Sequence, residues 1–281
     1  LLVVRRITGA DTLTPAISAN LPISVPTTSS PLNVPVLGRT QTALDALDDR
    51  LFEAKVSNGR LWTAHNIQVD ATGAASNSGG RTGSRWYEIT NLDTTPVLLQ
   101  AGTLYSSATT NPDSYWIPSI GITGQGHAAI ASSVAGAARF PEIAYAGRLS
   151  GDTLGTLRTP TTAVSSSNSY TVAANRWGDY SHTATDPNDN MTLWTFQEYA
   201  PTTSSWGVRA IQLRAPPPAT VTSISPNSLA QGQTQTVVVT GTSTQGSAFY
   251  DPPANFPNRL LANFGTGVTV NAVLASSPTS A

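Results

Sequence analysis

The residues most able to do chemistry are gathered in one stretch, NRWGDYSHTATDPNDNMTLWTFQEYA (175–200). It holds two of the six tryptophans, one of the three histidines, three aspartates and one of the four glutamates. These residue types could form an acid-catalysed active site, a metal-binding loop, a sugar-binding surface, or the turns and core of a β-fold. Each of these sites would use a different subset of the side chains.

Hydrolysis of a glycosidic bond requires two carboxyl groups roughly 5–9.5 Å apart. Every glutamate of the chain lies in or beside an apolar or aromatic run, where burial would raise its pKa. These residues are Glu53, Glu88, Glu142 and Glu198. Because the sequence does not fix their separations, we favour the interpretation that they are strand residues paired with nearby arginines.

The loop DPNDN (186–190) alternates oxygen ligands with turn residues, as calcium sites do. Asp179, Asp186 and Asp189 would be the ligands. The loop lacks the D-x-D-x-D-G spacing and the distant glutamate of an EF-hand, so we favour a hairpin turn rich in Asp and Asn. We therefore predict no cofactor, with a structural calcium ion as the alternative.

The histidines His65, His127 and His182 are 62 and 55 residues apart. They could bind zinc only if corresponding positions of different hairpins converged on one axis. Partly buried, hydrogen-bonded histidines are the interpretation that we favour.

Two Arg-Trp pairs, Arg85-Trp86 and Arg176-Trp177, offer a sugar-binding surface of indole rings and guanidinium groups. Trp86, Trp177 and Arg176 are the candidate ligand-binding residues. Adjacent residues of a strand point to opposite faces, however, so structural packing with one side chain in the core is the simpler interpretation.

The elements that would position these residues are β-strands, because short β-branched or aromatic runs alternate with Gly, Asn, Asp and Pro. Three segments, 49–67, 115–134 and 177–199, each read as strand, turn, strand. Trp62, Ala128 and Trp194 occupy corresponding places in them at a spacing of 66 residues. Repeated antiparallel units of this kind are typical of β-propeller blades.

One segment has helical spacing. Leu44, Leu47 and Leu51 recur with that period in TALDALDDRLFEA (42–54), which predicts a short helical turn leading into a strand.

The composition changes at RAPPPA (214–219), where three prolines favour a stiff linker. We predict a propeller-like domain over 1–214, a linker over 215–219 and an Ig-like β-sandwich over 220–281. The opening LLVVRR reads as a strand and not as a signal peptide. We expect the chain to be an excerpt of a longer one, with both domains incomplete.

The overall charge excludes some partners. The net charge is −1, only 11% of residues are charged, and no run of lysine or arginine occurs. This disfavours nucleic acid and anionic membranes as partners. No apolar run is long enough for a transmembrane helix. The chain has no cysteine and therefore no disulfide or thiolate metal site.

Two resemblances follow from these motifs. SISPNSLAQGQTQTVVVTGT and ANFGTGVTVNAV resemble strands of an IPT/TIG-type Ig-like domain. LDDRLFEAKVSNGRLWTAH, SRWYEI, IPSIGITGQGHAAIASS, FPEIAYAGRLSGDTLGTL and the 175–200 stretch resemble secreted bacterial proteins with a sialidase-like or BNR-like propeller. The expected fold is all-β: part of a propeller of antiparallel blades, then an Ig-like sandwich.

The resemblance to sialidases implies three arginines that grip a carboxylate, a tyrosine nucleophile with a glutamate base, and an aspartate acid/base. The residues of these types are Arg148, Arg176, Tyr145, Tyr180, Glu142, Glu198 and Asp179. No spacing selects among them. Of the Asp-box S-x-D-x-G-x-T-W, only Asp189 and Trp194 fall into register.

We therefore expect an extracellular or cell-surface bacterial protein without catalytic activity, whose propeller loops bind a glycan or a protein. A structural role by self-assembly belongs to the same class, since β-domains with open edges assemble by strand addition. A sialidase-like glycoside hydrolase is the alternative.

Overall fold

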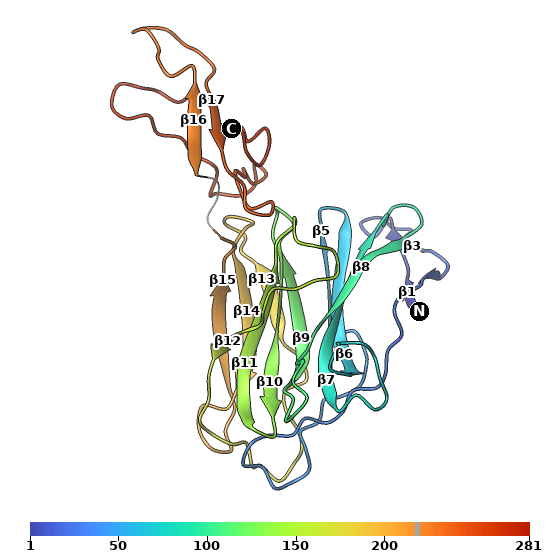
Figure 1. Ribbon diagram of the computed structural model, residues 1–281. Coiled ribbons are helices and arrows are strands. Elements are labelled where there is room, and N and C mark those ends of the chain that lie inside the picture. Colours follow the sequence, from blue (N-terminus) through green and yellow to red (C-terminus); the bar gives the residue numbers. More distant parts are fainter. Residues whose placement is uncertain (217–219) are drawn as a thin grey trace.

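The computed structural model describes residues 1–216 and 220–281, which form strands and loops without helix (Figure 1). The predicted all-β class is confirmed. Residues 217–219 of the predicted proline linker lie outside the described residues. Within the described ranges, no helix is long and apolar enough to cross a membrane.

Three antiparallel sheets form the body, and each follows the order of the chain. The first sheet contains β5 (Glu53–Ser57), β6 (Arg60–Val69), β7 (Arg81–Thr90) and β8 (Val97–Leu104). The second contains β9 (Ser114–Ile122), β10 (Ala128–Gly136), β11 (Arg139–Arg148) and β12 (Thr161–Val164). The third contains β13 (His182–Thr185), β14 (Leu193–Tyr199) and β15 (Gly207–Leu213).

The three predicted hairpins are the first two strands of these sheets: β5–β6, β9–β10 and β13–β14. The β5–β6 turn shows why the first hairpin could be predicted from the sequence. Asn58 and Gly59 both have positive φ, 51° and 70°, which is the conformation that a two-residue Asn-Gly hairpin needs. A repeated strand-turn-strand unit is therefore present three times in the body.

The sheets pack face to face, with the second sheet between the other two (Figure 1). Between the first and second sheets, Trp62 and Trp86 stack with centroids 5.8 Å apart and contact a cluster of Ile and Ala side chains. Between the second and third sheets, Ala129 packs with Leu193 and Leu213. The central sheet thus has both faces buried.

A further core lies at one end of the stack. Trp116 and Trp177 pack there at 6.1 Å, and Tyr170 meets Trp177 edge-on at 5.1 Å. The segment before β5 contributes Val34 and Leu44, which pair with each other through backbone hydrogen bonds of 2.7 and 2.9 Å. This core fixes the chain that leads into β5.

The helical turn predicted over 42–54 is wrong. Leu44 instead forms an isolated bridge with Val34, and Leu47 has a φ of 60°. The aspartates explain the difference: Leu47 N–H donates to Asp45 Oδ1 at 2.8 Å, and Arg50 N–H donates to Asp48 Oδ1 at 3.0 Å. These local bonds satisfy backbone donors in a non-helical conformation and compete with helix formation.

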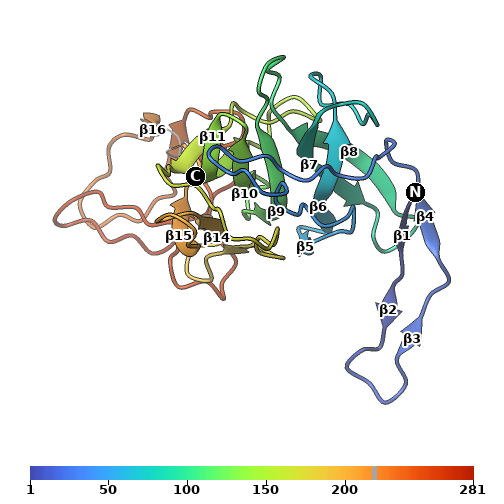
Figure 2. The same ribbon diagram turned by 90° about the horizontal axis from the view of Figure 1, so that it is seen from below.

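The first 23 residues form an arm that stands away from the sheets (Figure 2). β1 (Leu2–Val4) pairs with β4 (Leu21–Ile23), and β2 (Ile7–Thr8) pairs with β3 (Ala16–Ile17). The strand predicted at the opening LLVV is confirmed. Arg6 fastens the base of the arm to the β7–β8 turn by donating to Leu92 O at 2.9 Å and Thr94 O at 2.8 Å.

The last described segment, 220–281, contains β16 (Val221–Ser225) and β17 (Val238–Gly241), which pair with each other. The described residues form only this two-stranded ladder and isolated bridges there, so the Ig-like sandwich stays a prediction. The segment docks on the turns of the second and third sheets. Asn190 donates to the Tyr250 hydroxyl at 2.7 Å, and Gly151 N–H donates to Gln245 O at 2.9 Å.

We predict that Trp86→Ala destabilises the fold by about 3–5 kcal/mol, because Trp86 is fully buried between two sheets and leaves a cavity. Trp206→Ala is the matched control. Its side chain is 61% exposed, so the change should stay within about 0.5 kcal/mol. Urea unfolding measures both, and equal losses would contradict the face-to-face packing.

A second prediction concerns pH. Ser150 N–H donates to His127 Nδ1 at 3.0 Å, and burial lowers the pKa of His127 to about 4. An unfolded histidine titrates near pKa ~6.5, so the unfolded state binds the proton first. The contribution of neutral His127 to the free energy of unfolding should be fully present above pH ~6.5 and should be lost as the pH falls from there towards 4. His127→Gln should reduce this fall in thermal unfolding; an unchanged pH dependence would contradict the assignment.

Candidate functional site

Two segments that lead into β5 and β13 form the most highly charged part of the body. Residues 45–55 enter and include part of β5, and residues 175–182 lead into β13. We call these two segments the seam. Eight of the chain's 15 basic and 16 acidic residues lie within it. They are Asp45, Asp48, Asp49, Arg50, Glu53, Lys55, Arg176 and Asp179.

Direct contacts hold the two segments of the seam side by side. Asp45 N–H donates to Asn175 O at 2.7 Å. Phe52 meets Tyr180 edge-on with ring centroids 6.0 Å apart. The first sheet and the third sheet each contribute one segment, and β5 and β13 both contact β9 of the second sheet between them.

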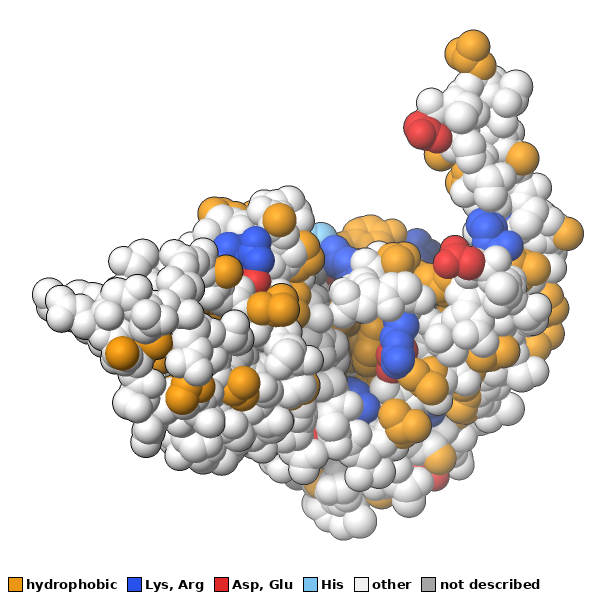
Figure 3. All heavy atoms as spheres, turned by 90° about the horizontal axis from the view of Figure 1, so that it is seen from above, with side chains coloured by type: hydrophobic (Ala, Val, Ile, Leu, Met, Phe, Trp, Pro, Cys, Tyr) orange, Lys and Arg blue, Asp and Glu red, His pale blue; other side chains and the backbone are white. Residues whose placement is uncertain are grey.

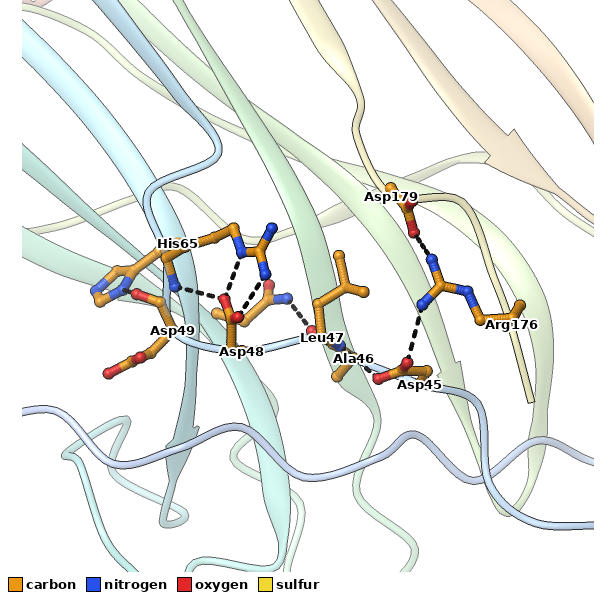
Figure 4. A network of polar contacts seen from close by, with 10 residues as sticks. Asp45, Ala46, Leu47, Asp48, Asp49, His65, Arg176 and Asp179 are labelled. Carbon is orange, nitrogen blue, oxygen red and sulfur yellow. Dashed lines mark hydrogen bonds and ion pairs between the residues drawn. The ribbon is translucent and has the colours of Figure 1, made fainter.

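Arg176 connects the two segments at one end of the seam (Figure 4). Its guanidinium donates to Asp45 at 3.2 Å and to Asp179, which is in its own segment. The Arg176 and Asp179 side chains are about half exposed, at 54% and 48%. Arg176 and Asp179, both from the 175–200 stretch, thus pair with each other at the surface.

The acidic turn that opens the seam positions a second arginine. Asp48 accepts two bonds from Arg50, at 2.7 Å from Nε and 2.6 Å from Nη2. Hydrogen bonding to Arg50 lowers the pKa of Asp48 to about 2. Two-point pairing of this kind fixes the plane of the guanidinium. Asp48 and the nearby Tyr180 hydroxyl raise the pKa of Arg50.

Glu53 is the most buried acid of the seam and has an unused acceptor. Its Oε1 lies 2.6 Å from Lys55 Nζ and 2.6 Å from His182 Nδ1. Its Oε2 is buried and accepts no hydrogen bond from the described residues. Buried acceptors without a donor are uncommon in folded proteins. Because this oxygen is buried, a ligand at the surface does not reach it.

An aromatic ring lies beside these charges. Tyr180 is 58% exposed, which is high for a tyrosine supported by another aromatic residue. Phe52 packs against the edge of the Tyr180 ring. The Arg50 guanidinium lies close to the Tyr180 hydroxyl, and Asp179 is the preceding residue in the chain. The arrangement presents an exposed ring with hydrogen-bonding groups around it.

Glu198 lies below the 175–182 segment. Its Oε2 accepts from Gly178 N–H at 2.9 Å, and burial raises its pKa. A Cβ at position 178 would overlap with this carboxylate, so a larger residue there would displace the Glu198 side chain. Glu198 therefore supports the backbone beside Asp179 and makes no hydrogen bond to Arg176.

Three other candidates of the sialidase-type set lie elsewhere. Arg148 pairs with Ala128 at the β9–β10 turn and donates to Thr153 O at 3.0 Å and Asp152 O at 3.2 Å. Glu142 accepts from Arg139 at 2.8 Å. Tyr145 packs at the contact of the second and third sheets. The structure thus brings together Arg176, Asp179, Tyr180 and Glu198, but not Arg148, Glu142 or Tyr145.

The candidate metal ligands do not converge. Asp186 accepts from Trp194 Nε1 at 2.8 Å, and Asp189 accepts from Thr192 N–H at 2.8 Å. Both thus serve the β13–β14 turn, while Asp179 pairs with Arg176. Among the described residues, no group of three His, Asp or Glu side chains could hold a metal ion.

The histidines and tryptophans also separate. His65 Nδ1–H donates to Asp49 O at 2.6 Å, and its Nε2 accepts from the Tyr87 hydroxyl at 2.9 Å. His182 is instead exposed beside Glu53. Trp86 and Trp177 are buried in the cores, so neither can stack on a ligand. Of the three predicted ligand-binding residues, only Arg176 lies at the surface.

Residues 45–55 were missed as part of a site. The run DALDDR is the densest group of charges in this weakly charged chain, and that density was the available signal. Its leucines instead suggested a helix.

Comparison with family models, with curated proteins and with solved structures found no match to this chain.

We predict that the arginines of the seam contribute little to stability. Arg176→Ala should cost less than about 1 kcal/mol and Arg50→Ala should leave the stability unchanged, because exposed ion pairs are screened by water. Arg139→Ala is the comparison: its side chain is 22% exposed and bonds Asp113 and Glu142, so its loss should exceed about 1.5 kcal/mol. Urea titrations measure all three variants, and an equal loss for all would mean that the seam is structural.

Proposed function

We propose that this chain is a non-catalytic glycan-binding protein of the cell surface or extracellular space, and that the seam is its binding site. The observation that carries the proposal is the exposed Tyr180 ring, supported by Phe52 and surrounded by fixed polar groups.

The physical basis is the mixed character of a sugar ring. One face of a pyranose carries C–H groups, which pack on an aromatic ring, while its hydroxyls need donors and acceptors at the rim. Tyr180 offers the ring, and Arg50 and Asp179 offer the rim. Guanidinium groups already oriented by carboxylates lose little freedom on binding a ligand.

The proposal includes an assignment of the sheets to known fold types. We take the three sheets to be propeller blades and residues 220–281 to be an IPT/TIG-like module of a secreted bacterial protein. The repeated meanders, stacked face to face, support the blades. The contact of β5 with β9 and of β9 with β13 also supports them, because the first strands of blades surround a common axis.

A sialidase-like activity is less well supported. It requires several arginines aimed at one carboxylate, but Arg50 and Arg176 are each occupied by aspartates. Arg148 lies at the β9–β10 turn, whereas Trp177, next to Arg176, bonds Ser133 five residues further along β10. At 3.3 Å per residue this separates the two arginines by about 15 Å or more.

The test is glycan binding by the whole chain. After a glycan array identifies a bound oligosaccharide, Tyr180→Ala should weaken its binding at least tenfold, which is about 1.4 kcal/mol. Trp206→Ala removes another exposed aromatic ring outside the seam and should leave the affinity unchanged. Titration calorimetry measures both variants.

Two results would overturn the proposal. Absence of binding to any glycan, or equal affinity in Tyr180→Ala and wild type, would remove the seam as a glycan site. Hydrolysis of fluorogenic sialosides that is lost in Glu198→Gln would show that the protein is an enzyme.

A further inference from the structure

A hollow opens between the first and second sheets at the end of the body where the segment 220–281 docks. Figure 3 looks onto this end and shows the hollow near its centre, with basic and acidic side chains inside it. The β5–β6 turn, the β9–β10 turn and the loop after β11 surround it. Its volume is about 300 Å³, which is the size of a site for a small molecule.

A buried carboxylate forms part of the wall of the hollow. Glu88 is 3% exposed, and its Oε1 accepts from Arg60 Nη1 at 2.6 Å. Its Oε2 accepts from Gln100 Nε2, while Gln100 Oε1 accepts from Gly155 N–H at 2.8 Å. These bonds fix the carboxylate and the amide in place, so a ligand meets groups that are already oriented.

A buried arginine lies in the same wall. Arg148 is 2% exposed and donates to Thr153 O at 3.0 Å and to Asp152 O at 3.2 Å. Both acceptors are backbone carbonyls, so no carboxylate of the described residues forms an ion pair with this guanidinium. Burial lowers the pKa of Arg148. A buried charge without an opposite charge is costly, and a bound anion would remove that cost.

The acids around Arg148 are already used by other arginines. Glu88 and Asp152 are the carboxylates whose charge acts on Arg148. Glu88, however, is paired with Arg60 at 2.6 Å, and Asp152 is paired with Arg158 at 2.9 Å. Three guanidinium groups therefore face two carboxylates, which leaves one positive charge in excess.

The excess charge and the remaining lining define the ligand. The other polar residues of the lining are uncharged and suit hydroxyl groups; they are Ser57, Asn58, Gln125 and Ser150. One carboxylate balances the single excess charge, whereas a phosphate group carries about two negative charges and an ammonium group would restore the excess. We propose that this hollow binds a small hydroxy acid, with its carboxylate at Arg148 and its hydroxyl groups on the uncharged rim. The hollow shares no residue with the seam, so this site is independent of the glycan site.

A nuclear magnetic resonance titration of the whole chain tests the proposal, with lactate and glycerate as probes. Both should shift the backbone amide signals of Gly126 and Ser150, which line the hollow, in a saturable manner. Lactamide has a similar shape without the negative charge and should bind at least about tenfold more weakly. Inorganic phosphate should also bind more weakly than lactate.

The count of charges predicts opposite effects for two substitutions. Arg60→Gln removes one positive charge and frees Glu88 to pair with Arg148, so lactate should bind about tenfold more weakly. Glu88→Gln removes a negative charge from the wall, so lactate should bind more tightly. Arg209→Gln is the matched control, because it removes one positive charge from β15, outside the hollow, and should leave the affinity unchanged.

The outcome does not depend on a damaged fold. The Arg60 side chain is 45% exposed, so its loss leaves the core intact, and the amide spectrum of each variant reports whether it is folded. The absence of saturable shifts with lactate and glycerate would overturn the proposal, as would an unchanged affinity in Arg60→Gln. Equal binding of lactamide, or tighter binding of inorganic phosphate than of lactate, would also overturn it.

Discussion

Burial of the second sheet on both faces is the constraint on which the rest of the structure depends. Every residue of β9 and β10 is buried, and most of those of β10 are Ala, Ser or Gly. Small side chains let the outer sheets approach closely, and Gly121 has no room for a Cβ beside Thr183. Polar groups at this contact form a network: the Ser119 and Thr183 hydroxyls lie 2.7 Å apart, and Gln197 Nε2 donates to Ser119 at 2.9 Å. Gln197 Oε1 accepts no hydrogen bond from the described residues. Both halves of the seam are placed by packing against this one sheet.

The strands and hairpins could be predicted because their signals are local. An Asn-Gly pair between β-branched residues predicts a turn whatever surrounds it. The segment before β5 could not be predicted in the same way. Its leucine spacing fits a helix, but Asp45 and Asp48 bond their own backbone, and Leu44 is taken up by Val34 from an earlier segment. Tertiary pairing and side-chain capping together outweighed a weak helical periodicity.

Only part of the candidate site could be predicted from the sequence, for a different reason. Arg176, Asp179 and Tyr180 stood out by residue type in one stretch, but their partners Asp45 and Phe52 lie far away in the chain. The resemblance to sialidases grouped Arg148 with Arg176, and the structure places them at different ends of the stack. Only the three-dimensional packing can decide which residues of like type become neighbours.

The distribution of charge separates stability from recognition. Only 11% of the residues are charged, so most of the polar side chains of this chain are uncharged ones such as Ser, Thr and Asn. A cluster of charged residues is therefore unusual in this chain. Those of the seam are mostly exposed pairs, which contribute little to folding. The partly buried ion pairs of Arg139 with Asp113 and Glu142 are expected to stabilise the fold instead. Charges that are concentrated at one surface and oriented by short bonds are the reason why we propose an external polar ligand for the seam.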